Sequence, residues 1–185
     1  MTDPSVFKHH FLLAMPGLAD PNFSSTITYL FDHSEKGAMG LVINRPSELT
    51  LGDMFDQLGI EGDHARNSPV LQGGPVERER GFILHGDDVD FDASVDLGHG
   101  IRLSTARQVL EAISKGNGPE KFIVALGYAG WEGGQLEREL SENTWLSCPA
   151  NAEIIFETPF EMRVQRAADA LGIDFRLISS QPGEA

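Results

Sequence analysis

The amino-acid sequence predicts a single α+β domain built on a mixed sheet. Strand-like runs in the first half are paired around short polar linkers, which is typical of hairpins, whereas the second half alternates strands with helices. The chain has 185 residues, about the size of one domain, and no linker, repeat or low-complexity segment divides it. We therefore expect one domain over residues 1–185, structured from about residue 8 to residue 178, with a tail at each end.

The first half carries the clearest strand signals. Residues 11–15 form an apolar run that a Pro-Gly pair ends. Residues 26–31 and 38–43 are rich in β-branched and aromatic side chains, and the polar, glycine-ended segment between them predicts a hairpin. Shorter runs at 70–72 and 82–85 flank a glycine-containing segment and predict two further strands.

Capping residues mark where the helices begin and end. Thr50, with Asp53 three residues later, predicts the start of a short helix over residues 51–58 that Gly59 ends. Three further helices are expected: one that Ser104 or Thr105 caps, a short one over residues 135–140, and one that begins at Pro159 and ends at Gly172.

Strands are expected around these later helices. The most apolar of them covers residues 122–126, and a glycine-rich turn follows it. Two short strands within 94–103 are predicted to turn near residues 98–100. Short apolar runs at 154–156 and 175–178 predict the last two strands.

The net charge limits the classes of partner. The chain has 14 Lys and Arg against 28 Asp and Glu, which gives a formal net charge of -14. Contacts from Lys and Arg to phosphate supply most non-specific nucleic-acid affinity, so this acidity disfavours direct binding to nucleic acids and anionic membranes. A lone cysteine, no signal-peptide pattern and no run of about 18 apolar residues together predict a cytoplasmic protein.

The glycines, acidic residues and histidines do not match known cofactor motifs. A dinucleotide loop that began at Gly98 would need glycine where Leu103 stands, and no Walker-type motif occurs. Alternating acidic residues at 88–92 resemble the start of a calcium loop, but Ala93 and His99 stand where glycine and glutamate are required. No histidine or cysteine spacing fits structural zinc. We expect no metal and no cofactor.

Two groups of side chains keep an enzymatic function open. Cys148 is the only cysteine, and a histidine partner would meet it in space and not in sequence; a buried, inert thiol is the alternative. Carboxylates gathered near residue 138 could perform acid–base chemistry, but their mixture with Arg138 favours a solvated helix surface. These carboxylates are Glu132, Glu137, Glu139 and Glu142.

Less common motifs follow one another along nearly the whole chain. They are Met15-Pro16, Asp20-Pro21 with Phe23, His33, the segments 37–46, 73–76, 81–85 and 127–137, and Trp145-Leu146. In this order and at these spacings the motifs resemble those of the AlgH/YqgE family of bacterial proteins. The resemblance extends from about residue 10 to the last predicted strand.

The resemblance implies a fold but no activity. It implies a bifurcated, largely antiparallel sheet that curls into a pseudo-barrel with helices packed outside. The family is largely uncharacterised: it has no agreed catalytic activity or cofactor, and its label as a transcriptional regulator rests on a genetic association. No motif in this chain resembles a helix-turn-helix, and the negative charge disfavours direct operator binding.

The glycine-rich motifs define the candidate ligand site. Gly73 and Gly74, like the segment 127–134, remove side chains, so a ligand or another backbone can approach closely. Arg45 is the natural anion anchor because a guanidinium binds carboxylate or phosphate through paired hydrogen bonds. The other polar and aromatic groups expected around such a cleft are Asn44, His85, Tyr128, Trp131 and Gln135.

These motifs also have a purely structural interpretation. The glycines would then mark tight turns, Trp131 would pack in the core, and Arg45 would pair with a carboxylate. The leading prediction is a cytoplasmic binding or regulatory protein that acts through a small molecule or a protein partner, without direct DNA contact. An enzyme of unknown type that uses the glycine-rich cleft is the second interpretation, and direct DNA binding is the third.

Overall fold

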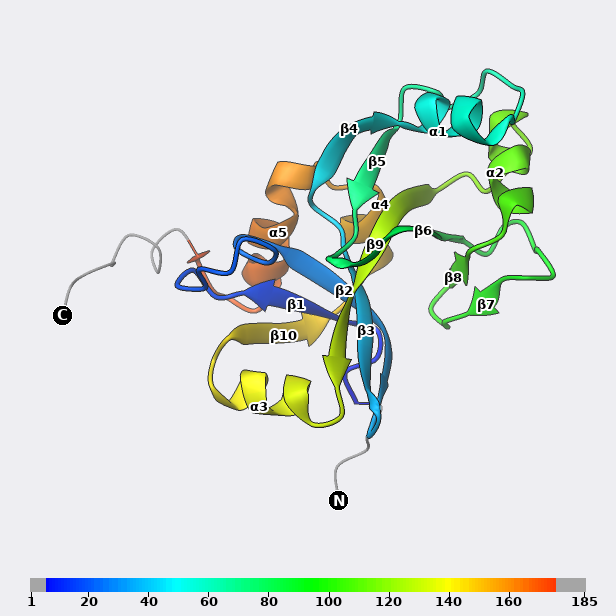
Figure 1. Cartoon of the computed structure of the whole chain (residues 1–185). Helices are drawn as coiled ribbons and strands as arrows, with labels where there is room; N and C mark the ends of the chain where they lie inside the picture. The colour runs from blue at the N-terminus through cyan, green and yellow to red at the C-terminus, as the bar shows by residue number, and fades with distance from the viewer. Residues whose placement is uncertain (1–5, 176–185) are drawn as a thin grey trace.

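The computed structural model describes residues 6–175 (Figure 1). Among these residues, no helix is both long and apolar enough to cross a membrane. In chain order the elements are β1 (His10–Ala14), β2 (Ile27–Ser34), β3 (Gly37–Val42), β4 (Pro46–Thr50), α1 (Leu51–Leu58), β5 (Pro69–Gln72), β6 (Val76–Gly86), β7 (Val95–Asp96), β8 (Ile101–Ser104), α2 (Arg107–Ser114), β9 (Phe122–Glu132), α3 (Gln135–Ser141), β10 (Trp145–Pro149), α4 (Ala152–Phe156), the 3₁₀ helix η1 (Phe160–Met162) and α5 (Arg163–Ala170).

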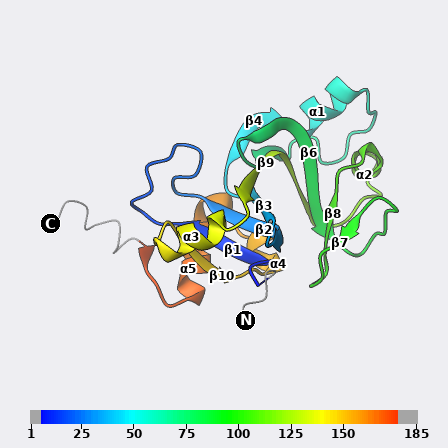
Figure 2. The ribbon, with the colours of Figure 1, turned by 60° about the horizontal axis from the view of Figure 1, so that its bottom comes forward.

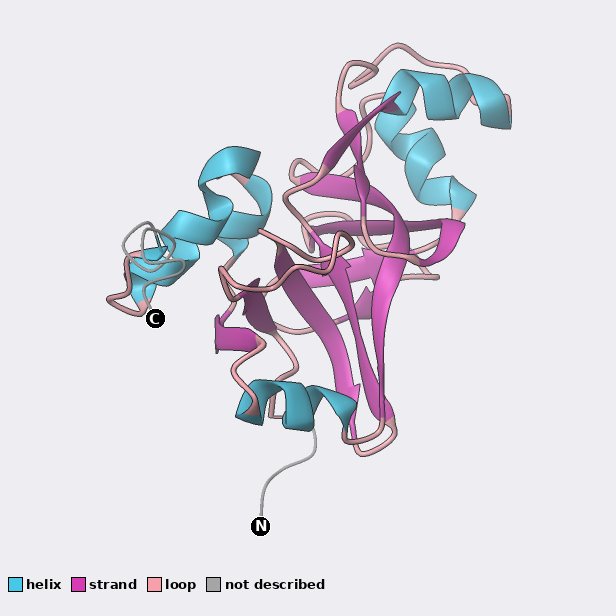
Figure 3. Cartoon of the chain, turned by 60° about the vertical axis from the view of Figure 1, so that its left-hand side comes forward, coloured by secondary structure: helices cyan, strands magenta, loops and turns pink. Residues whose placement is uncertain are grey.

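The strands form one branched and strongly curled sheet. Its main path has the order β10-β1-β2-β3-β9-β6-β8-β7, and β4 and β5 branch from it at β9. Neighbours on the main path are antiparallel, and so are β4 and β5, whereas β5 runs parallel to β9. The strands curl into a half-barrel with the helices around the outside (Figures 2 and 3). The expected α+β class, with a bifurcated and largely antiparallel sheet, is confirmed.

The sheet divides along β9. The C-terminal part of β9 pairs with β3, from Gly40 opposite Ala129 to Gly37 opposite Glu132. Its N-terminal part pairs with β6 and β5 instead. Where β3 and β9 separate, Gly73 bridges them: its carbonyl accepts from Val42 N at 2.8 Å and its N–H donates to Leu126 O at 2.8 Å. We call this point the bifurcation.

Several local predictions are confirmed. β2 and β3 form the expected hairpin, with a register shift between Leu30 and Asp32. At the start of α1, Thr50 Oγ1 accepts from Asp53 N at 3.1 Å, and Asp53 Oδ2 accepts from Thr50 N at 3.0 Å. Gly59 ends that helix in the left-handed conformation at φ 68°. This reciprocal capping box satisfies two donors that a helix start otherwise leaves free.

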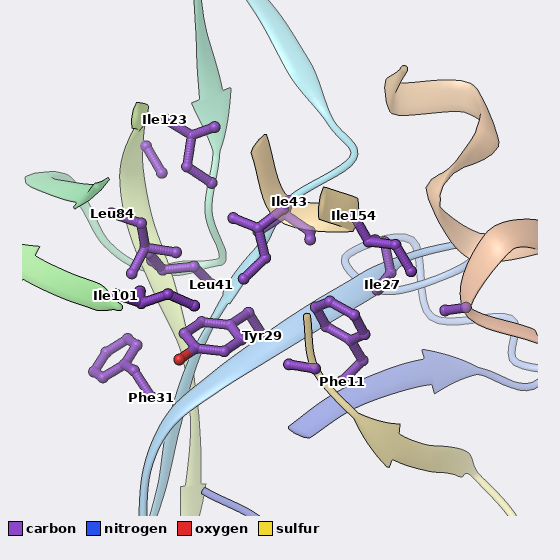
Figure 4. Close-up of a cluster of buried hydrophobic side chains, with 14 of the residues drawn as sticks. Phe11, Ile27, Tyr29, Phe31, Leu41, Ile43, Leu84, Ile101, Ile123 and Ile154 are labelled. Atoms are coloured by element: carbon purple, nitrogen blue, oxygen red, sulfur yellow. The ribbon is translucent and has the colours of Figure 1, made fainter. Parts of the chain in front are cut away.

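The largest core cluster draws its residues from both halves of the sheet (Figure 4). Phe11 and Tyr29 come from the β1–β2 side, Leu84 and Ile101 from the β6–β8 side, and Ile154 from α4. All but Ile154 are completely inaccessible to solvent. Because the two halves share this apolar interior, the curl of the sheet is stabilised by burial on its concave side.

Two predictions about the second half are wrong. The segment expected as a glycine-rich turn continues β9 as far as Glu132, because Ala129 and Trp131 alternate into the interior and pair with β3. Residues 154–156 belong to helix α4 and not to a strand, because Asn151 Oδ1 caps a helical turn by accepting from Ile154 N at 2.9 Å.

Other differences concern boundaries and unpredicted strands. Neither Ser104 nor Thr105 caps α2: the N-cap is Ala106, and Ser104 ends β8. The last helix begins as η1 after Pro159 and continues as α5, with Gly172 beyond its end at φ 74°. Strands β4 and β10 were not predicted. Residues 176–178 of the predicted final strand lie outside the described residues.

Candidate functional site

The structure does not bring the predicted site residues together in one cleft. Tyr128 is half-buried and packs its ring edge-on against Phe82 at 5.7 Å between centroids. The others fall into three places: Asn44, Arg45, Gly73 and Gly74 lie at the bifurcation, Trp131 and Gln135 lie beside α3, and His85 lies at the opposite end of β6–β9, across from Phe122.

At the bifurcation, the glycines let backbones approach one another. A Cβ on Gly74 would lie 2.1 Å from the carbonyl carbon of Tyr128, and one on Gly73 would lie 2.4 Å from Gly127 O. A Cβ on Gly127, where φ is 79°, would lie 2.4 Å from Gly74 O. Only glycine fits these positions, because real Cβ atoms do not approach other atoms this closely. The close approach here is therefore between strands of the same chain.

Asn44 and Arg45 hold the loop before β2 against the start of β4. Asn44 Oδ1 accepts from Ile27 N at 3.1 Å, and its Nδ2 donates to Ser25 O at 2.9 Å. Arg45 Nη1 donates to Asn22 O at 2.7 Å, and its Nη2 donates to Ser24 O at 2.8 Å. Carbonyl oxygens, and not the carboxylate of the structural interpretation, therefore hold Arg45. Its guanidinium keeps further N–H groups for another acceptor.

A cavity of about 290 Å³ opens beside Arg45. Its walls come from the loop before β2, from β4 and β5, from the start of β6 with the segment before it, and from β9. None of the described residues that line it is acidic. The lining consists of Asn22, Arg45, Ser47, Leu71, Gln72, Gly74, Pro75, Arg78 and Leu126.

Arg78 is the residue of this cavity that the sequence did not reveal. It lies in a wide bulge of β6, where Val76 pairs with Tyr128 but the next pair joins Gly81 to Leu126. Glu77 begins the bulge at φ 45°, a conformation that is uncommon outside glycine. Within residues 6–175, neither Arg45 nor Arg78 forms an ion pair. In a chain of net charge -14, the two arginines therefore form a local positive site.

A second polar cluster surrounds Glu139 on α3. Its Oε1 accepts from both indoles, Trp131 Nε1 at 3.0 Å and Trp145 Nε1 at 2.9 Å. Its Oε2 accepts from Gln135 Nε2 at 2.9 Å. Both indole rings are buried, so the expectation that Trp131 would pack in the core is met. The cluster joins α3 to β9 and β10, and Glu139 is not part of a purely solvated surface; Glu142 is exposed, as expected.

His85 and Ser104 form a hydrogen-bonded pair without access to solvent. His85 Nε2 lies 2.8 Å from Ser104 Oγ, and His85 Nδ1 lies 2.8 Å from Gly86 O. A carbonyl only accepts, so Nδ1 carries the proton and Nε2 accepts from the serine. Burial lowers the pKa of His85, which favours the neutral ring. Ser104 is 1% exposed and His85 is 0% exposed, so a substrate cannot reach this serine.

Cys148 lies on β10 and is buried. Burial raises the pKa of its thiol to about 11. A thiol in this state is a poor nucleophile at neutral pH, because the thiolate is the reactive form. Among the described residues, no group of three or more His, Cys, Asp or Glu side chains is arranged to hold a metal ion.

Comparison with known proteins identifies similar sequences along the full chain. A model of the AlgH-like family matches residues 11–176. The UPF0301 protein AlgH of Pseudomonas aeruginosa is 48% identical over 187 residues, which covers 100% of this chain and 98% of that protein. A UPF0301 protein of Stutzerimonas stutzeri is 51% identical over 187 residues, with the same coverage.

Two solved structures share the fold. The solution structure of the Pseudomonas aeruginosa AlgH protein matches with a TM-score of 0.81 at 48% identity, over 100% of this chain and 99% of that one. A crystal structure of a Corynebacterium diphtheriae protein matches with a TM-score of 0.73 at 18% identity, over 97% of this chain and 94% of that one. The second likeness concerns the fold alone.

Proposed function

The chain belongs to the AlgH-like family, and we propose that it is a binding protein that holds the anionic group of a small ligand between Arg45 and Arg78. The names of its relatives state no activity, so the proposal rests on the cavity at the bifurcation. The observation that carries it is the pair of arginines, without carboxylate partners among the described residues, around a cavity of about 290 Å³ whose lining has no acidic side chain.

The two arginines have different parts in this proposal. The carbonyls of Asn22 and Ser24 fix the orientation of the Arg45 guanidinium before any ligand arrives. Arg78 is exposed and lies in the bulge of β6, so its side chain can change conformation to contact a bound anion. A preoriented donor reduces the entropy lost on binding, and a guanidinium matches the geometry of carboxylate and phosphate.

A regulatory role in the cytoplasm is part of the same proposal, with ligand occupancy as the signal. The enzyme alternative gains no support from Cys148, which is buried, or from Ser104, which is closed to solvent. Direct DNA contact is not proposed, because a net charge of -14 opposes it.

The proposal is tested by calorimetric titration with inorganic phosphate and with acetate, in chloride buffers of matched ionic strength. Arg78→Gln should weaken binding about tenfold or more, since a hydrogen bond to a charged group contributes about 1.5–3 kcal/mol. Arg138→Gln is the matched control: Arg138 is exposed on α3 and does not line the cavity. Equal binding by both variants, or no binding of either anion, would contradict the proposal.

A further inference from the structure

A second cavity, of about 470 Å³, lies next to the first. Arg78 and Leu126 line both cavities, so the two meet at the bulge of β6. On β4, Ser47 lines the first cavity and Leu49 the second. We call these two adjoining cavities the trough.

The far end of this trough is mainly apolar. Met54 and Leu58 are one helical turn apart on α1, and Leu110 faces them from α2. Leu58 is 41% exposed, one of the few large apolar side chains of the described chain that remain open to solvent. When a large apolar side chain is exposed at a cavity, an apolar group that binds there removes apolar surface from water, which is favourable.

Charge is distributed unevenly along the trough. Arg45 and Arg78 provide positive charge at the bifurcation end, where no described lining residue is acidic. Glu79 lines the apolar end together with Arg107, whose Nε is already paired with Glu111 at 2.8 Å. A second negative group on the ligand would therefore meet one positive and one negative side chain there, without the excess of positive charge found at the bifurcation end. The distribution favours an occupant with one anionic end and an uncharged tail.

We propose that the ligand is a linear alkyl carboxylate, with its carboxylate between Arg45 and Arg78 and its hydrocarbon chain over Leu126 toward Leu58. This inference rests on the proposed function and adds the chemical class of the ligand. Each methylene that enters the apolar end should raise the affinity about two- to fourfold, because burial of a methylene is favourable by a nearly constant amount.

The test is calorimetric titration of the whole protein with acetate, butanoate, hexanoate and octanoate, and with 1-octanol as a ligand that has a tail and no charge. We expect affinity to rise along the carboxylate series and 1-octanol to bind at least tenfold more weakly than octanoate. Arg78→Gln should weaken every carboxylate, whereas Leu58→Asn should weaken octanoate at least threefold and leave acetate unchanged. Val95→Asn is the matched control, since Val95 is 57% exposed and lines neither cavity.

The outcomes separate this inference from the proposed function. If acetate and phosphate bind through Arg78 but octanoate binds no tighter, the inference is overturned and the anion site stands. If octanoate and 1-octanol bind equally and Arg78→Gln changes neither, binding is apolar only and both proposals fail. The trough is supported if affinity rises with the length of the carboxylate chain and if Leu58→Asn, but not Val95→Asn, reduces this rise. Thermal melts of each variant show whether it is folded.

Discussion

Removal of the Glu139 carboxylate should destabilise the protein far more than its half-exposed position suggests. In Glu139→Ala, two indole N–H groups lose their acceptor on rings that are 6% and 4% exposed. A buried donor without a partner costs about 1–3 kcal/mol, so the two together cost about 2–6 kcal/mol. Water can reach part of the site, so we expect a loss of about 2–4 kcal/mol and a fall in Tm of about 5–15 °C.

The assay can observe this site directly. The chain has two tryptophans, and both donate to Glu139, so intrinsic fluorescence during urea unfolding reports on these two rings. Far-UV circular dichroism of the same samples tests whether unfolding is two-state. Glu139→Gln should lose only about 1 kcal/mol, because its amide oxygen still accepts from both indoles.

Glu142→Ala is the control for this prediction. Glu142 is exposed at the end of α3 and should change stability by no more than about 0.5 kcal/mol. If Glu139→Ala were no less stable than Glu142→Ala, the two indoles would not depend on this carboxylate and the reasoning would be refuted.

Three further predictions concern other parts of the molecule. Cys148 should be unreactive toward a chromogenic disulfide reagent in the folded protein at pH 8 and fully reactive in urea, since burial raises its pKa to about 11; rapid labelling of the folded protein would contradict this. Gly74→Ala should cost about 3 kcal/mol or more in urea unfolding, because its Cβ would overlap the backbone of β9, whereas Gly17→Ala, with no atom within 4 Å, should be neutral. Burial and then His99 lower the pKa of His9 from 6.5 to about 4, so the unfolded chain takes up the proton first. The contribution of neutral His9 to the free energy of unfolding is therefore fully present above pH 6.5 and is lost as the pH falls toward 4. Between these pH values, the free energy of unfolding should fall less in His9→Gln than in the unsubstituted protein.

The sequence predicts correctly those helix ends that are determined by residues a few positions apart in the chain. The capping box at Thr50 and Asp53 lies within one turn of chain and gave the start of α1 correctly. The strand predicted for Ile154–Phe156 is wrong because a short apolar run has no periodicity that separates strand from helix. The branch of β5 onto β9 was not predictable from residues 69–72, since that pairing depends on a strand far along the chain.

In the candidate site, too, the chemistry of a single side chain could be predicted from the sequence, but a position set by a distant strand could not. The chemistry of its side chain makes Arg45 a candidate from the sequence alone, and the structure places it at a cavity. Arg78 could not be predicted from its neighbours, because it stands among residues of alternating charge that make no patch in the sequence. Its one signal is its place shortly after the Gly73–Val76 motif. Arg78 lies in the bulge of β6 and lines the same cavity as Arg45, and a bulge depends on the partner strand.

The central position of β9 also affects how the protein is made. Strands β3, β5 and β6 all precede their common partner in the chain, and β1 likewise waits for β10. A nascent chain that ends before residue 122 therefore presents several strands with unpaired edges, the kind of surface on which chains associate. The surplus of acidic residues makes such chains repel one another during this interval. The pairings of β3, β5 and β6 with β9 therefore cannot form until residues 122–132 have been synthesised.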